Sequence, residues 1–248
     1  MEEIYYLYGV IKATENKNFG LSGLSTSGKP DEILVEANEG LGIVYSIKEL
    51  NEDGEITASR KNLVNHQKVI ELVMAEGETI VPFSFGTLLK THGEVKDLAV
   101  KKNDEFNALL QKISGKIELS IKMMWEKMDP VFADIIEENE EIKEKRSFMA
   151  ANNIQTQNDK IELGQLVEKA LLSKKEGYAA KILDQLTPSA IEHKVLNNIT
   201  DAMFLNVAFL VDQADEEKFD EAVNKMSEDY SENILIKYVG PVAPVNFI

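Results

Sequence analysis

One segment of this sequence comes near a nucleotide-binding motif. Residues 23–29 read Gly-Leu-Ser-Thr-Ser-Gly-Lys and match the glycine and lysine spacing of a phosphate-binding loop. The next residue is Pro30, where the motif needs a serine or threonine hydroxyl for Mg²⁺. A second glycine pair, Gly40 and Gly42, has Tyr45 at the third glycine position of a dinucleotide fingerprint. We interpret the first segment as a surface loop and the second as part of a hairpin.

Metal binding or acid–base catalysis would require the histidines or the carboxylates. The three histidines, His66, His92 and His193, are far apart and lack the H-x-x-x-H spacing of a zinc-binding helix. His66 falls on the apolar face of its predicted helix, which favours a hydrogen-bonded core histidine. Carboxylates crowd into a short run with interspersed basic residues, which is typical of a solvated helix face; they are Asp134, Glu137, Glu138, Glu140, Glu141 and Glu144.

Nucleophilic chemistry also lacks its usual residues. There is no G-x-S-x-G segment, and the chain contains no cysteine, so disulfides, thiolate metal sites and cysteine nucleophiles are excluded. We therefore expect no catalytic residues, no metal site and no cofactor.

The charge of the chain limits its partners. Its 248 residues include 27 basic and 43 acidic side chains, a net charge of −16 at neutral pH. Nucleic acids and anionic membranes are bound through clustered lysine and arginine, so neither is an expected partner. The N-terminal residues are acidic where a signal peptide is basic, and no apolar run approaches the length of about 20 residues that spans a bilayer. We expect a cytoplasmic protein.

The first half of the chain predicts an α+β domain. Ser59 is placed to cap a helix whose apolar face carries Leu63, His66, Ile70 and Val73. Residues 12–31 are rich in Gly, Ser, Asn and Lys and are predicted to form a loop. Residues 38–40, Asn-Glu-Gly, predict a hairpin turn. The remaining expected elements are strands over residues 4–11, 33–37, 41–45 and 79–85, the last on a sheet edge or at a bulge because of its proline, and a helix over 95–113.

The second half predicts the order β-α-β-β-α-β. The expected strands are residues 116–125, 191–196, 203–211 and 233–239, with helices over 130–175, where an apolar stripe includes Val167 and Leu171, and around 219–226. This order is typical of a ferredoxin-like domain, an antiparallel sheet with helices on one face. We predict an α+β protein of two domains. Residues 1–115 would form a related, modified α+β sandwich, and residues 116–248 the ferredoxin-like domain with a long helical insertion and a C-terminal tail.

Two aromatic patterns exceed what such a fold requires. Phe83 and Phe85 are expected on one strand face, before Gly86 breaks the strand. In the tail, Gly240 and Pro241 are expected to end the last strand, and the residues after it run on to Asn-Phe-Ile. The tail either packs back on its own domain or contacts a partner. The candidate contact residues are Phe83, Phe85, Tyr238, Pro241, Pro244 and Phe247.

With these residues in view, the whole chain resembles the GvpL/GvpF family of gas vesicle proteins. The resemblance rests on short motifs in order: residues 6–9 (Tyr-Leu-Tyr-Gly), Arg60 to Leu63 with His66 and Val69, Pro82-Phe83 with Phe85-Gly86-Thr87, Glu118-Leu119 with Trp125, and residues 238–241 (Tyr-Val-Gly-Pro) with Pro244 and Asn246-Phe247. The chain departs from the pattern at Ser84, where a basic residue is expected, and at Val242 and Val245, which replace aromatic residues.

The resemblance implies a non-enzymatic accessory protein of gas vesicle assembly. Such a protein would bind the hydrophobic major shell subunit, associate with other gas vesicle accessory proteins, and help nucleate or extend the shell. An acidic chain of this kind could cover an apolar subunit and keep the complex dispersed. A small-ligand-binding regulatory module, or an enzyme on a ferredoxin-like fold, remains the alternative, because fold alone does not define function.

Overall fold

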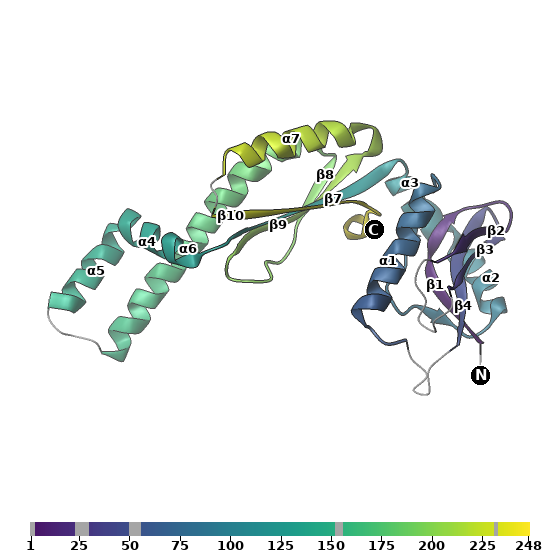
Figure 1. The fold of residues 1–248 in the computed structure, drawn as a ribbon, viewed down its shortest axis with the longest axis horizontal. Helices are drawn as coiled ribbons and strands as arrows, with labels where there is room; N and C mark the ends of the chain where they lie inside the picture. Colours follow the sequence, from purple (N-terminus) through teal and green to yellow (C-terminus); the bar gives the residue numbers. More distant parts are fainter. Residues whose placement is uncertain (1–2, 23–29, 50–55, 152–155, 231–232) are drawn as a thin grey trace. The chain divides into compact units, whose positions relative to one another are not determined.

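A computed structural model describes residues 3–22, 30–49, 56–151, 156–230 and 233–248 (Figure 1). Its contacts divide the chain into two compact units. Unit 1 comprises Met1–Glu118 together with Pro241–Ile248, and unit 2 comprises Leu119–Gly240. The tail, which the sequence assigned to the second domain, therefore belongs by its contacts to unit 1, and unit 2 is an insertion within unit 1.

Unit 1 is built on a sheet whose strand order is β2-β3-β4-β1-β5, with β6 also paired to β1. The strands are β1 (Glu3–Lys12), β2 (Lys17–Leu21), β3 (Glu32–Asn38), β4 (Leu41–Glu49), β5 (Val81–Pro82) and β6 (Leu88–Leu89). Strand β2 lies within the segment predicted to be a loop. Its five residues, Lys-Asn-Phe-Gly-Leu, include only two apolar side chains and are mostly exposed at the sheet edge, so the sequence gives only a weak strand pattern.

Helices cover both faces of this sheet. They are α1 (Arg60–Ala75), α2 (His92–Lys101) and α3 (Asn103–Ile113). Val69 and Val73 of α1 join one apolar cluster with Tyr6 and Tyr8 of β1. The other cluster contains residues of α2 and α3 together with Leu7 of β1. Strand β1 therefore contributes to two cores.

A bulge in β1 changes which of its residues face each core. The register against β4 shifts between Leu7 and Gly9, so Val10 joins the same cluster as Leu7 although its sequence parity is that of Tyr8. At Gly9 a Cβ atom would lie 2.6 Å from Ile80 Cγ1 and 2.6 Å from the Val81 carbonyl oxygen. Glycine is required at position 9 because Ile80 and Val81 of the same protein approach the backbone of β1 so closely.

Several local predictions for unit 1 are confirmed. Strands β3 and β4 are joined by a two-residue turn in which Glu39 and Gly40 both have positive φ, 49° and 81°, the geometry of a type I′ hairpin. The Ser59 side chain caps α1 by accepting a hydrogen bond from the Asn62 N–H at 3.2 Å. Pro82 lies on the edge strand β5, where its missing N–H leaves no ladder bond unmade.

Two other predictions for unit 1 are wrong in extent. The strand expected over residues 79–85 pairs only at Val81–Pro82. The helix expected over residues 95–113 is two helices that change direction at Lys102, and the first begins earlier, at His92. That earlier start reflects a capping box in which Thr91 and Glu94 satisfy each other's backbone N–H groups.

Unit 2 contains a four-stranded sheet in the order β10-β7-β9-β8. Its elements are β7 (Lys116–Trp125), α4 (Met128–Glu138), α5 (Glu140–Ala151), α6 (Gln157–Leu186), β8 (Glu192–Val195), β9 (Met203–Asp212), α7 (Glu216–Glu228) and β10 (Ile234–Val242), of which β7 begins and β10 ends in unit 1. Helices α6 and α7 both pack on β9. The Tyr178 and Phe204 ring centroids are 5.3 Å apart, and those of Phe219 and Phe209 are 5.0 Å apart.

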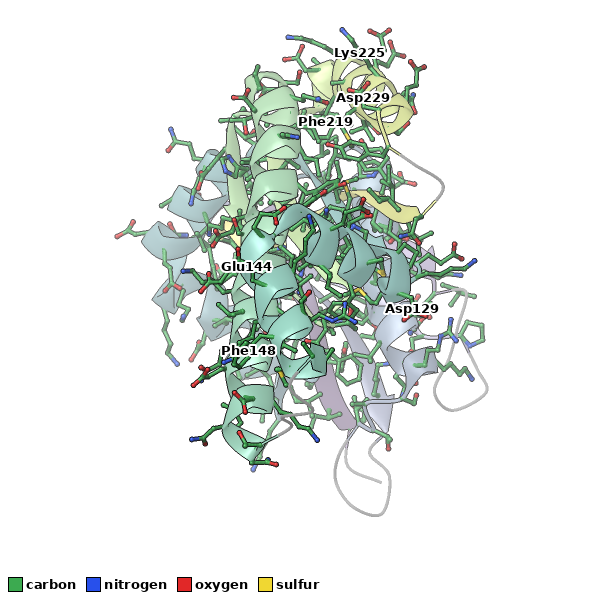
Figure 2. The ribbon with its side chains drawn as sticks, turned by 90° about the vertical axis from the view of Figure 1, so that its left-hand side faces the viewer. Asp129, Glu144, Phe148, Phe219, Lys225 and Asp229 are labelled. Carbon is green, nitrogen blue, oxygen red and sulfur yellow. The ribbon has the colours of Figure 1, made fainter. Side chains whose placement is uncertain are left out.

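The helical insertion forms an arm that extends beyond this sheet (Figure 1). Helices α4 and α5 lie beside the N-terminal half of α6. Lys174 of α6 forms ion pairs with Asp134 and Glu138 of α4, while Lys145 of α5 pairs with Glu162 of α6. The carboxylate run is exposed on these helices, as predicted; Figure 2 shows Glu144 on α5.

Strand β10 corrects one prediction. Gly240 and Pro241 do not end it, because the strand continues to Val242. β10 is an edge strand, so proline is tolerated, and Gly240 adopts a φ of 139° that favours glycine. The protein as a whole is a mixed α+β structure with antiparallel sheets, as the sequence predicts.

Candidate functional site

A chain of hydrogen bonds buried in unit 1 passes through His66. The Gly86 N–H donates to the Tyr6 hydroxyl oxygen at 3.4 Å, and the Tyr6 O–H donates to His66 Nδ1 at 2.8 Å. His66 Nε2 lies 3.0 Å from the Phe83 carbonyl oxygen. A carbonyl oxygen can only accept, so Nε2 carries the proton and Nδ1 is the acceptor. Helix α1 and strand β1 thereby fix residues 83–86.

The protonation states in this network are set mainly by burial. Burial lowers the pKa of His66, and the nearby Lys48 ammonium lowers it further, although the bond to Phe83 acts in the opposite direction. Burial also raises the pKa of Tyr6 to about 12 and raises the pKa of Tyr8. The imidazole and both phenols are therefore neutral at neutral pH.

This network has no space for a substrate. The cavity beside Tyr6, Tyr8 and His66 has a volume of about 10 Å³, which is the volume of a single water site. The Lys48 ammonium on its wall is 2.6 Å from Asp31 Oδ2 and 5.0 Å from the Tyr6 ring centroid. These groups bind one another, and their arrangement supports the fold of unit 1. His66 is the hydrogen-bonded core histidine that the sequence predicts.

The two predicted contact phenylalanines belong to different cores. The Phe83 ring packs edge-to-face on Phe106 at 5.9 Å, in the cluster formed with α3. The Phe85 ring packs on Tyr6 and His66, at 6.1 Å and 5.9 Å, in the cluster formed with α1. The prediction that they share a strand face is wrong, because β5 ends at Pro82 and the chain turns after it. Both side chains are half-buried.

The four predicted contact residues near the C-terminus differ in exposure. Tyr238 is 37% exposed, and Pro241 is also exposed. The Tyr238 hydroxyl donates to Asp220 Oδ1 at 2.5 Å; burial and this bond both raise its pKa. Pro244 is buried, and Phe247 is 0% exposed.

The tail is held on unit 1 by polar contacts as well. Asn246 donates from its backbone N–H to Glu118 Oε2 at 2.9 Å and from its side-chain amide to Glu118 Oε1 at 2.6 Å. The Lys112 ammonium donates to the Phe247 carbonyl oxygen at 2.6 Å. Glu118 is buried, so the tail supplies partners to a carboxylate that solvent does not reach. Of the two predicted roles for the tail, the structure shows it packed back, on unit 1.

The remaining sequence candidates that lie within the described residues form no metal site. The glycine- and lysine-containing segment over residues 23–29 lies outside the described residues. Among the residues that are described, no three His, Asp or Glu side chains are grouped to hold a metal ion. In unit 1, His92 Nε2 lies 2.9 Å from Glu36 Oε2. In unit 2, the His193 ring lies against the Phe209 ring.

Unit 2 has two exposed apolar features that the sequence does not predict. On β10, Leu235 and Val239 alternate onto one strand face and are 44% and 51% exposed. In the helical arm, a groove of about 410 Å³ lies beside α6; it is lined by Phe132, Gly164, Val167, Glu168, Leu171, Leu172, Lys175 and Asp201. The apolar stripe of α6 was visible in the sequence. The sequence does not show that part of this stripe is exposed, because periodicity does not tell which neighbouring element covers a helix face.

The similarity to known proteins covers nearly the whole chain. The sequence profile of the family "Gas vesicle synthesis protein GvpL/GvpF" matches residues 4–248. The chain belongs to the GvpL/GvpF family. It is 30% identical over 244 residues to gas vesicle protein F of Nostoc sp., covering 98% of this chain and 96% of that protein.

Solved structures of family members agree with the fold. The crystal structure of GvpF from Anabaena sp. matches with a TM-score of 0.84 and 27% identity, covering 99% of this chain and 98% of the other. GvpF from Microcystis aeruginosa matches with a TM-score of 0.81 and 28% identity, covering 98% of each chain.

Family membership assigns the protein to gas vesicle formation and confirms the resemblance found in the sequence motifs. Its named relatives are gas vesicle proteins. Within the described residues, none of the helices has the length and apolar character needed to cross a bilayer.

Proposed function

We propose that this protein is a non-enzymatic accessory factor of gas vesicle assembly that binds the hydrophobic major shell subunit in the cytoplasm. The observation that carries the proposal is the GvpL/GvpF family match over residues 4–248. The polar network around His66 gives it further support, because Tyr6, His66 and the Phe83 carbonyl bond to one another and the cavity beside them has a volume of only about 10 Å³.

The exposed edge of unit 2 is the surface that we assign to the shell subunit. Tyr238, one of the predicted contact residues, lies on the face of β10 that contacts α7, opposite the face that carries Leu235 and Val239. Pro241 lies further along the same strand. An edge strand with exposed apolar side chains can pair with an extended segment or cover an apolar patch. Phe83, Phe85, Pro244 and Phe247 would instead support the fold of unit 1.

We also propose that the chain forms two domains and that the second is ferredoxin-like. The element order β7, helical arm, β8, β9, α7, β10 and the strand order β10-β7-β9-β8 both support this assignment. The domain boundaries would follow the contact units, with residues 241–248 completing the first domain.

Co-expression with the major shell subunit tests the proposed binding. Affinity capture of this protein in mild buffer should recover shell subunit in soluble form. Val239→Asp should reduce the recovery, because a charge on the contact face must be desolvated on binding. Val195→Asp is the matched control, since Val195 lies on β8, the other edge of the same sheet, and is 60% exposed.

Recovery lost in Val239→Asp and retained in Val195→Asp would support both the binding and its surface. Equal recovery in both variants would remove β10 from the contact. An aggregated shell subunit beside a clean eluate of the wild-type protein would contradict shell-subunit binding itself.

A further inference from the structure

We propose that the groove of the helical arm is a docking site for an amphipathic helix from another protein, with an apolar face flanked by lysine or arginine. This inference extends beyond shell-subunit binding at β10, because the groove lies on different elements.

The spacing of the groove residues on α6 is that of a helix-packing stripe. Gly164, Val167, Glu168, Leu171, Leu172 and Lys175 fall at i, i+3, i+4, i+7, i+8 and i+11. Phe132 of α4 forms part of the wall. Leu172 is 56% exposed, so the stripe presents apolar surface to solvent. Ridges of a third helix can pack between such rows, and the stripe spans about 16 Å along the axis.

Gly164 is the position at which the backbone of another helix could approach α6 most closely. A Cβ added there would have no atom within 4 Å, so nothing within the described chain requires glycine at this position. Glycine inside a helix is less favourable than alanine by about 1 kcal/mol. Its absent side chain lets another backbone approach α6, as small residues do at helix interfaces.

The charges at the groove select the occupant. Glu168 and Asp201 are exposed, and neither forms an ion pair with any described residue. Lys175 is the cation among the lining residues. A second copy of this chain would bring a net charge of −16 to this site, which opposes self-association. A helix with basic residues beside its apolar face would neutralise the two carboxylates.

The test uses the full-length protein and two fluorescent synthetic peptides of about 20 residues, enough to span the stripe. Both peptides share a leucine and alanine face. One carries lysine on its polar face and the other carries glutamate. Binding is measured by fluorescence anisotropy. Gly164→Leu should block the groove, while Gly177→Leu is the matched control, a glycine of the same helix that also has no atom within 4 Å of its Cβ position and does not line the groove.

Both substitutions replace glycine by a better helix former, so both variants should melt at or above the wild-type temperature. We expect the lysine peptide to bind wild type and Gly177→Leu with a Kd below about 100 µM, and Gly164→Leu at least about tenfold more weakly. The glutamate peptide should bind weakly to all three proteins.

Three results would overturn the proposal. One is the absence of lysine-peptide binding to the wild type in this range. Another is equal binding by Gly164→Leu and Gly177→Leu. The third is sedimentation showing that the wild type self-associates and that Gly164→Leu alone abolishes this, since the occupant would then be a second copy. None of these results depends on binding of the shell subunit.

Discussion

The neutral state of His66 makes the stability of unit 1 depend on pH. In the unfolded chain its pKa is near the ordinary value of 6.5, and in the folded protein burial lowers it. Between these two values the unfolded state binds more protons, so the free energy of unfolding decreases as the pH falls. The contribution is fully present above pH 6.5 and is lost progressively below it, towards the folded-state pKa.

Denaturant unfolding at a series of pH values checks this prediction. The wild type should lose stability as the pH falls below 6.5. His66→Gln should flatten this part of the profile. An NMR titration in which the folded His66 ring protonates above pH 6.5 would contradict the assignment.

Removing the Tyr6 hydroxyl should test the network itself. Tyr6→Phe leaves the buried His66 Nδ1 without its donor and the Gly86 N–H without its acceptor. We expect a loss of about 1–3 kcal/mol in the free energy of unfolding. Tyr5→Phe is the matched control, since the Tyr5 hydroxyl makes no hydrogen bond with the residues that the structure describes. Equal losses in the two variants would show that the network adds little stability.

At the scale of elements, the bulge of β1 depends on Gly9. In Gly9→Ala the new methyl group would lie 2.6 Å from Ile80 Cγ1 and from the Val81 carbonyl oxygen. One of these is backbone, so β5 must move away, and we expect destabilisation by about 1–3 kcal/mol. Gly164→Ala is the contrast, because its Cβ meets nothing within 4 Å and it should stabilise α6 by up to about 1 kcal/mol. Thermal unfolding of both variants decides whether steric contact or helix propensity governs each site.

The elements that the sequence predicts well carry a strong local pattern. Strand β9 is apolar over nearly its whole length, α1 has a capping serine, and the β3–β4 turn contains a glycine with positive φ. Strand β2 is not predicted by the sequence, because its five residues contain only two apolar side chains and such a short pattern is weak. The extension of β10 through Pro241 was missed because proline disrupts only a strand that needs its N–H, and the sequence does not show which strands are edges.

At the scale of the whole molecule, the tail should stabilise the fold through a single aromatic side chain. Phe247 is 0% exposed, so Phe247→Ala should destabilise the protein by about 3–5 kcal/mol. Val245→Ala, two residues earlier and 48% exposed, should change stability by less than about 0.5 kcal/mol. Chemical denaturation measures both, and similar values for the two variants would show that the tail is only loosely held.

In the candidate site as well, the sequence predicts the features that depend on local spacing and does not predict the contacts between residues far apart in the chain. The core role of His66 follows from helical spacing, because a buried imidazole needs hydrogen-bond partners wherever the fold places them. The contacts of Asn246 with Glu118 join residues 128 positions apart, and no periodicity predicts them. The groove beside α6 needs Phe132 and Asp201 from separate elements, so it emerges only once the arm has folded.

The insertion of unit 2 within unit 1 orders events during translation. Residues 1–118 are synthesised first, but the residues that seal their core, Ala243 and Phe247 among them, follow only after all of unit 2. Domains generally fold as they are made, from the N-terminal end. Here unit 1 cannot complete its packing until residues 241–248 have been synthesised. Until then its apolar site is uncovered, and Glu118 lacks the hydrogen bonds from Asn246. A nascent chain that stalls within unit 2 therefore exposes this site, and an unsealed apolar surface marks it for chaperones or proteases.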